Sequence, residues 1–333
     1  IKIPKLLKDK LKNKKIIEIY NQFEKSLNLS ENFVVAVSGG PDSLALAFLA
    51  KIYSIKKQLD PRFLIIDHKL RPESSKEATN VKHLLKKNLI TSEILTLRGK
   101  KPKKNIQSYA REKRLELIFK KCEKLRINNI LLGHHQDDLV ENFFIRMVRG
   151  SGLKGLTSLD IRTKINKKNL IRPLLYQKKS DLIFLSKKVF NFYVKDPTNK
   201  DEKYQRVRIR KLLKELEKDG LDKKKIFQTL KNLKHSNDVV NFYVDKNVYK
   251  NTFFSEKYNK LILNKDFFDQ PYEIILRALS ESLKLIGKKY HPVRGRKLDK
   301  IIKDYEKNQF FRVTLGGCII EKVNQTVIIS KEH

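Results

Sequence analysis

The chain has 333 residues, of which 40% are hydrophobic, and this length predicts two domains, or one large and one small domain. It carries 74 Lys and Arg against 37 Asp and Glu, a formal net charge of +37 that favours RNA or another polyanion as a partner, although a lysine-rich proteome would produce the same excess. Its two cysteines, Cys122 and Cys318, lack CxxC spacing, which excludes a disulfide framework and a structural zinc site. No apolar run reaches the length of a membrane span, which excludes a membrane protein. Together these features predict a cytoplasmic location.

The first half of the chain alternates short apolar runs with longer amphipathic stretches. Helices are predicted at 14–27, 74–87, 106–125 and 137–149, strands at 33–37, 62–66, 92–97 and 129–132, and a further helix after residue 43. Short strands that alternate with helices are typical of a parallel sheet with helices on both faces. We therefore predict an α/β fold for this half.

The second half is more mixed. A lysine-rich hairpin over 161–169 is expected to interrupt the fold, before a helix over 178–190 and a turn at 196–199. Further predictions are helices over 224–243, 273–286 and 294–305, a small hairpin at 253–263, and strands at 311–313, 318–322 and 327–330. We expect one domain over residues 1–213 and a smaller helical and β region over residues 214–333.

A polar turn, Ser38-Gly39-Gly40-Pro41-Asp42-Ser43, follows the first predicted strand. Both glycines can adopt positive φ and leave room for a ligand, and free N–H groups at a helix start attract an anion. The turn lacks the Gly-Lys-Ser/Thr of a Walker loop. It indicates another kind of phosphate-binding turn, with an ordinary strand-helix corner as the alternative.

Polar residues also follow two other predicted strands. Asp67 and His68 come after the second strand, and Gly133-His134-His135 come after the fourth. Because ligands bind beyond the carboxyl ends of parallel strands, these segments and the 38–43 turn are expected to meet at one rim. Their convergence favours a phosphate-binding turn at 38–43 over an ordinary strand-helix connection without a ligand.

The stretch GHHQDDLVEN, residues 133–142, is the second informative segment. If Asp137 begins a helix, Asp137 and Glu141 share a face, and Asp138 lies three residues before Glu141. Carboxylates in a first helical turn also favour the helix dipole, which is the structural alternative for both aspartates. That alternative leaves two histidines unexplained. HEXXH spacing is absent, and oxygen ligands suit Mg²⁺ bound with ATP phosphates better than a transition metal.

Six blocks have the order and spacing found in the tRNA(Ile)-lysidine synthases, a branch of the ATP-pyrophosphatase loop family. They are SGGPDS (38–43), IIDHKLRPESSKEA (65–78), NIQSYAREKRLELI (105–118), LLGHHQDDLVENFFIRMVRGSGLKGL (131–156), IRPLL (171–175) and KDPTNKDEKYQRVRIRKLL (195–213). The resemblance runs from about residue 33 to residue 213. It implies a Rossmann-like domain of the adenine nucleotide α-hydrolase type, followed by a smaller mixed helical and β region.

The resemblance also implies a reaction. Members of the family use ATP to adenylate the C2 oxygen of the wobble cytidine in the CAU-anticodon tRNA(Ile), and the ε-amine of free L-lysine then displaces AMP to give lysidine. Codon reading changes from AUG to AUA. The implied cofactors are ATP, as a substrate, and Mg²⁺, and a homodimer is left open.

The chemistry assigns roles to the motif residues. The ATP site is expected to comprise Ser38, Gly39, Gly40, Pro41, Asp42, Ser43, Asp67, His68 and Gly133. Asp42 is the expected Mg²⁺ ligand, with Asp137 or Asp138 as its partner. The incoming amine must lose a proton, for which Asp137, Asp138, Glu141 and His134 are unranked candidates.

Basic residues are assigned to RNA by the same resemblance. The set comprises Arg111, Arg146, Arg149, Lys154, Arg206, Arg208 and Arg210, with Arg172 as a weaker candidate. The alternatives are a surface ion pair for Arg111 and a solvated helix start for the three arginines at 206–210. Val207 stands where the family commonly has Asn, and Lys195 where it has an acidic residue.

The C-terminal region, 214–333, is expected to bind and position tRNA, with a basic turn at 291–296 as one contact. Two other functions remain open. A tRNA thiolase of the same loop family would use paired catalytic cysteines, which the spacing of Cys122 and Cys318 does not support. A catalytically silent RNA-binding protein is opposed by the intact acidic residues of the motifs.

Overall fold

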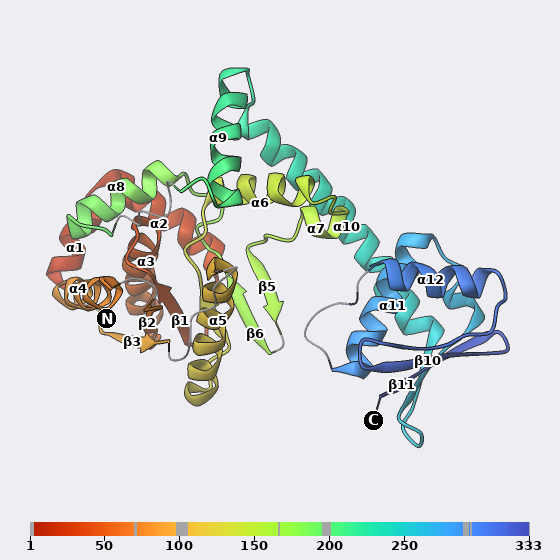
Figure 1. Ribbon diagram of the computed structural model, residues 1–333. Helices are drawn as coiled ribbons and strands as arrows, with labels where there is room; N and C mark the ends of the chain where they lie inside the picture. The colour runs from red at the N-terminus through yellow and green to blue at the C-terminus, as the bar shows by residue number, and fades with distance from the viewer. Residues whose placement is uncertain are drawn as a thin grey trace. The chain divides into compact units, whose positions relative to one another are not determined.

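The computed structural model describes residues 3–69, 72–97, 106–165, 167–194, 201–288, 293 and 295–332, with the side chains of 106–108 left undescribed. The predicted turn at 196–199 and half of the basic turn at 291–296, residues 291, 292 and 294, lie outside these residues. The chain forms two compact units, Ile1–Phe227 and Gln228–His333. The fold is α/β, with a mostly parallel sheet in the first unit and an antiparallel sheet in the second (Figure 1).

The first unit contains a six-stranded sheet in the order β3-β2-β1-β4-β6-β5. Its strands are β1 (Phe33–Val37), β2 (Arg62–Asp67), β3 (Ser92–Thr96), β4 (Asn129–Leu131), β5 (Arg162–Ile165) and β6 (Lys168–Ile171). All neighbouring pairs are parallel except β5 with β6. The expectation that the 161–169 hairpin interrupts the fold was wrong, because β6 pairs with β4 and the hairpin extends the sheet by two strands.

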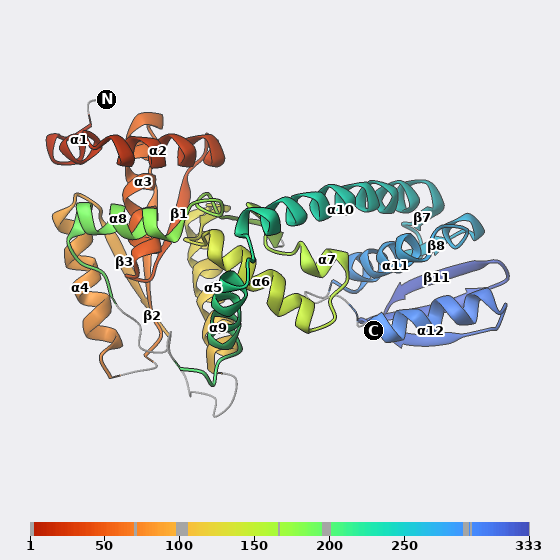
Figure 2. The same cartoon turned by 90° about the horizontal axis from the view of Figure 1, so that it is seen from above.

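Helices cover both faces of this sheet (Figures 1 and 2). They are α1 (Lys5–Leu11), α2 (Lys14–Leu27), α3 (Pro41–Lys57), α4 (Ser74–Lys87), α5 (Ile106–Leu125), α6 (Gln136–Val148), α7 (Leu153–Leu156), α8 (Lys179–Phe190) and α9 (Gln205–Lys218). Alternation along β1 explains the two layers: Phe33, Val35 and Val37 belong to a core shared with α2, α3, α4 and α8. Val34 belongs to a second core, which contains Cys122 of α5.

The second unit is built on a five-stranded antiparallel sheet in the order β7-β8-β11-β10-β9. Its elements are β7 (Thr252–Ser255), β8 (Lys260–Leu263), the 3-10 turn η2 (Lys265–Phe267), α11 (Tyr272–Gly287), α12 (Gly295–Glu306), β9 (Arg312–Leu315), β10 (Cys318–Val323) and β11 (Thr326–Lys331). The long helix α10 (Lys223–Asn251) crosses the boundary between the units. None of the helices in the described part of the chain combines the length and apolar composition that crossing a bilayer requires.

Candidate active site

The turn after β1 leads directly into α3. Gly39 has φ +84°, and a Cβ there would lie 2.5 Å from Cγ2 of Val81, so only glycine fits. The hydroxyl of Ser43 accepts a hydrogen bond from the N–H of Ser38 at 3.1 Å and donates one to the carbonyl of Gly40 at 3.0 Å. These bonds hold the turn closed at the N-terminus of α3, where N–H groups favour an anion.

Gly133 lets the end of β4 approach this turn closely. A Cβ on Gly133 would lie 3.2 Å from the carbonyl of Asp42 and from the nitrogen of Ser43. The first and fourth strand ends therefore meet, as the sequence predicted.

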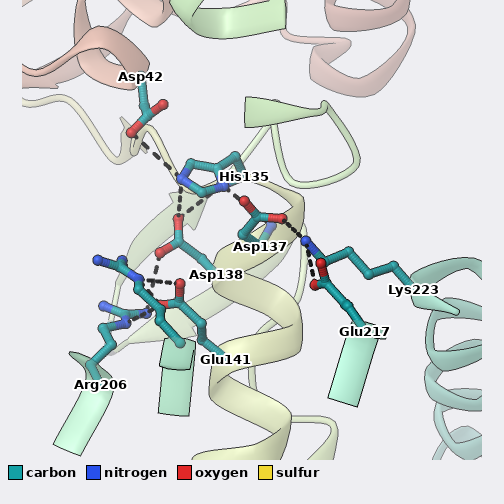
Figure 3. A network of polar contacts seen from close by, with 9 residues as sticks. Asp42, His135, Asp137, Asp138, Glu141, Arg206, Glu217 and Lys223 are labelled. Atoms are coloured by element: carbon teal, nitrogen blue, oxygen red, sulfur yellow. Dashed lines mark hydrogen bonds and ion pairs between the residues drawn. The ribbon is translucent and has the colours of Figure 1, made fainter. Parts of the chain in front are cut away.

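His135 lies at the centre of the site (Figure 3). It is the N-cap of α6, and its Nδ1 accepts the N–H of Asp137 at 3.2 Å. Because Nδ1 accepts a hydrogen bond, the proton of the neutral imidazole lies on Nε2. Nε2 is 3.5 Å from Oδ2 of Asp42 and 3.5 Å from Oδ2 of Asp138. The sequence interpretation chose His134 and missed His135, although the N-cap position before an acidic helical turn was a usable signal.

The two carboxylates beside His135 have different environments. Burial raises the pKa of Asp42, although His135 opposes this shift, and Oδ1 of Asp42 is buried without a hydrogen-bond partner. Burial acts in the same direction on Asp138, but His135 and Arg206 outweigh it and lower the pKa of that carboxyl. Asp138 also accepts the N–H of His135 at 3.0 Å. The same kind of side chain is thus a more basic group at Asp42 and a more acidic one at Asp138.

Glu141 and Asp137 are engaged in other contacts (Figure 3). Glu141 is only 2% exposed and forms ion pairs with Arg206 and Arg210 of α9. Asp137 contacts the ammonium of Lys223 at 3.2 Å. Helix α9 therefore supplies the cations that compensate the buried charge of α6.

Asp67 stabilises the local backbone at the end of β2. Its carboxylate accepts hydrogen bonds from the hydroxyls of Ser74 and Ser75 at 2.8 and 2.6 Å and from the N–H of Lys69 at 2.9 Å. Burial by itself would raise the pKa of Asp67, but these hydrogen bonds together outweigh burial and lower that pKa. The adjacent His68 is half-buried, and its Nδ1 has no hydrogen-bond partner.

The arginines and the lysine assigned to RNA differ in exposure, and two of the exposed arginines have hydrogen-bond partners within the chain. Arg111, Arg149, Lys154 and Arg208 are exposed, whereas Arg146 is half-buried. Arg149 donates to Gln205 at 2.7 Å, and Arg208 donates to the carbonyls of Glu202 and Lys203.

Arg172 is buried and donates to the carbonyl of Asp160 at 2.8 Å and to the hydroxyl of Thr163 at 2.9 Å. Arg114, a half-buried residue of α5, also has a buried Nε without a partner. The sequence interpretation did not single out Arg114, although it lies one helical turn after Arg111.

One carboxylate oxygen of this site is suited to Mg²⁺. Within the described residues, no group of three or more His, Cys, Asp or Glu side chains is arranged to hold a metal ion. The unpartnered Oδ1 of Asp42 is nevertheless suited to a hard cation that takes its other ligands from phosphates and water. Through His135, Asp138 lies opposite Asp42, while Asp137 points toward Lys223 (Figure 3).

Cysteine chemistry has little support at this site. Cys122 is buried in α5, and burial raises the pKa of its thiol to about 11. Cys318 is buried in the second unit. Thiolates are the reactive form of cysteine, and burial suppresses them.

Comparison with known proteins places these features in a family. Residues 10–216 match the PP-loop domain family. The tRNA(Ile)-lysidine synthase of Wolbachia sp. subsp. Brugia malayi (strain TRS) is 33% identical over 311 residues, covering 90% of this chain and 70% of that protein. The tRNA(Ile)-lysidine synthase of Orientia tsutsugamushi (strain Boryong) is 34% identical over 329 residues, covering 95% and 72%.

A solved structure supports the fold alone. The U34-tRNA thiolase NcsA from Methanococcus maripaludis matches with a TM-score of 0.57 and 16% identity, covering 66% of this chain and 79% of that one. The sequence matches are more informative because they extend over both units. With its ATP-binding PP-loop domain and these relatives, the chain belongs to the tRNA(Ile)-lysidine synthase family of ATP-dependent, tRNA-modifying ligases.

Proposed function

We propose that this protein attaches free L-lysine to C2 of the wobble cytidine in the CAU-anticodon tRNA(Ile), forming lysidine, AMP and pyrophosphate. The observation that carries the proposal is the contact of Asp42, from the PP-loop, and Asp138, from the second motif, with the same His135 nitrogen. Codon reading would change from AUG to AUA.

The first step is adenylation of the cytidine. Its C2 oxygen attacks the α-phosphorus of ATP, the bond between that phosphorus and the bridging oxygen breaks, and pyrophosphate leaves. The N–H groups after Gly39 would bind the polyphosphate. Asp42, with Asp138 beside the same imidazole, is the residue we assign to Mg²⁺, which would neutralise phosphate charge when bound.

The second step joins lysine to the base. The ε-nitrogen forms a bond to C2, the C2–O bond breaks, AMP departs with that oxygen, and the nitrogen loses a proton. Among the four predicted acceptors, Glu141 and Asp137 are engaged by basic side chains, and burial lowers the pKa of His134 to about 3, which makes it a weak base. Asp138 is paired with Arg206 and has a lowered pKa as well, so we assign the proton to the α6 carboxylates as a group, Asp137, Asp138 and Glu141, and not to His134.

We assign RNA binding to both units, with residues 1–213 as the catalytic domain and 214–333 as the positioning region. Arg146, Arg149 and Lys154 surround the α6–α7 bend of the first unit. In the second unit, α10 carries an exposed stripe of hydrophobic and lysine side chains, which we define as Val239, Phe242, Tyr243, Lys246, Tyr249 and Lys250. Aromatic faces can stack on unpaired bases while lysines contact phosphates. We also propose a cytoplasmic location.

The direct test is incubation of purified protein with ATP, Mg²⁺, labelled lysine and the CAU-anticodon tRNA(Ile). Label should enter this tRNA and not a matched transcript with adenosine at the wobble position. No incorporation, with a control enzyme active, would reject the proposal. A thiolase would instead lose its activity when Cys122 and Cys318 are both replaced by serine, and a silent RNA-binding protein would release no AMP.

The salt dependence of tRNA binding tests the role of the net charge of +37. Each phosphate contact releases counterions, so the logarithm of the association constant should fall steeply and linearly with the logarithm of salt concentration. A filter-binding series measures this slope. A flat response would mean that the basic charge is compositional.

A further inference from the structure

Four basic side chains gather at the strand ends, and Asp67, Asp138 and Asp160 offset part of their charge. His68 follows β2, His134 follows β4, Arg172 follows β6, and Arg114 projects from α5. We call them the histidine–arginine group. The sheet order β2-β1-β4-β6 brings the three strand ends to the rim where the 38–43 turn lies.

Each member has a buried nitrogen without a hydrogen-bond partner. These atoms are Nδ1 of His68, Nε of Arg114, Nδ1 of His134 and Nε of Arg172. Arg172 is only 5% exposed, and its Nη1 bonds to Asp160 and Thr163 hold its guanidinium in place. The two arginine Nε groups are donors, and a buried donor that lacks a partner costs about 1–3 kcal/mol, so these atoms indicate a ligand-binding role.

Burial and neighbouring positive charges lower the pKa values within the group. Burial, together with Arg111, lowers the pKa of Arg114 and of Arg172 to about 10, so both remain protonated at neutral pH. Burial, and then the positive charge of Arg114, lowers the pKa of His68 to about 4. At neutral pH the two arginines are therefore charged, whereas the two histidines are neutral.

The neighbouring carboxylates are already engaged. Asp67 accepts hydrogen bonds from Ser74, Ser75 and Lys69. Asp138 contacts Arg206 at 3.3 Å in addition to His135. Asp160 offsets part of the charge of Arg172, and the positive charge that the two arginines retain favours an anion at this rim.

We propose that His68, Arg114, His134 and Arg172 form a subsite that binds one oxyanion beside the Asp42–His135–Asp138 cluster. The inference rests on the proposed function for the source of the anion, which is either a phosphate group released from ATP or the carboxylate of the free amino acid. Both present oxygens that accept hydrogen bonds from guanidinium. Bound anion also favours protonation of the two imidazoles.

Calorimetric titration of the full chain with pyrophosphate, L-lysine and lysinamide tests the subsite. Arg114→Gln and Arg172→Gln should each weaken binding of the relevant anion by about tenfold or more, and Arg172→Lys should recover part of it. If the arginine variants lose affinity for pyrophosphate, the ligand is a phosphate group. If they lose affinity for L-lysine, and lysinamide binds the wild-type chain weakly, the ligand is a carboxylate. The matched control is Arg126→Gln, an exposed arginine before β4 at the other end of the strand.

Histidine NMR gives a second readout that a purely structural role would not move. The anion that binds should shift the ring signals of His68 and His134 and raise both pKa values. The proposal is overturned if neither probe binds the wild-type chain, or if affinities stay within about twofold in a folded Arg114→Gln protein. Because Arg114 is only half-buried, we expect Arg114→Gln to fold, and this variant tests the subsite even if Arg172→Gln does not fold. Anion binding without lysine transfer to tRNA would reject the proposed function and leave the subsite intact.

Discussion

The acidic residues of this site differ in the side chains that they contact. Asp42 and Asp138 both contact Nε2 of His135, yet their pKa values shift in opposite directions because their charged neighbours differ. Glu141, four residues after Asp137 on the same helix, is paired with arginines instead. Residue type alone therefore does not assign a role among the motif carboxylates.

Replacement of Asp42 by Asn should lower the rate of AMP release by on the order of a hundredfold or more, which in practice abolishes it, and should leave tRNA affinity nearly unchanged. Asn keeps the shape of the side chain but removes the negative charge at the buried Oδ1 position. AMP release and filter binding measure the two quantities. Asp60→Asn, at an exposed aspartate, is the control. A large loss of tRNA binding would show that the role of Asp42 is misassigned.

Helix α9 contributes to the site through two of its three N-terminal arginines. Arg206 and Arg210 are one helical turn apart and reach Glu141 together, whereas Arg208 is exposed and donates to the backbone carbonyls of Glu202 and Lys203. A buried carboxylate is stable only when it is paired. The helix thus holds α6 in place, which in turn positions His135 and Asp138.

Arg210→Gln should lower the free energy of unfolding of the first unit by about 1–3 kcal/mol, because Arg206 alone would compensate Glu141. Arg208→Gln should change it by less than about 0.5 kcal/mol. Urea unfolding followed by circular dichroism measures both. Combining Arg210→Gln with Glu141→Gln should restore part of the loss, and equal effects of the two arginine variants would contradict this account.

The exposed stripe on α10 leads to a separate prediction for RNA binding. Phe242 and Tyr243 are 63% and 48% exposed and pack edge to face, with their centroids 5.4 Å apart. Replacing both with alanine should weaken tRNA binding by about tenfold and leave its salt slope unchanged, since stacking releases few counterions. Phe310→Ala, at a residue that is 74% exposed, is the control. Equal affinities for the two variants would exclude stacking at this stripe.

At the scale of the whole molecule, buried basic groups make stability depend on pH. The folded-state pKa values of His68 and His134 are about 4 and about 3, below the ordinary value of 6.5. Between these values the unfolded chain binds more protons than the folded one. The contribution of both histidines to stability is therefore present above about pH 6.5 and is lost as the pH falls toward 4.

Thermal melts at pH 7 and pH 5 should show this loss in the wild-type chain. His68→Asn with His134→Gln should reduce the difference between the two melting temperatures, since each histidine accounts for roughly 1–2 kcal/mol at pH 5. His235→Gln, at an exposed histidine of α10, should not reduce it. If the double variant retained the full pH difference, other groups would account for the acid sensitivity.

The sequence by itself determined the alternation of strands and helices in the first unit, because hydrophobic period is a local property of the chain. Strand β1 and helices α2, α4 and α5 begin and end at the predicted residues. The convergence of the 38–43 turn with Gly133 was also predictable, since strands that run parallel must end at one edge.

Only the tertiary structure decided which residues become partners. It joined the β5–β6 hairpin to β4, and it joined the separate hairpin and meander of the second half into one sheet. It placed His135 between two carboxylates and the α9 arginines on Glu141. These choices depend on packing between segments distant in sequence, and no local pattern of charge or hydrophobicity specifies such a pairing.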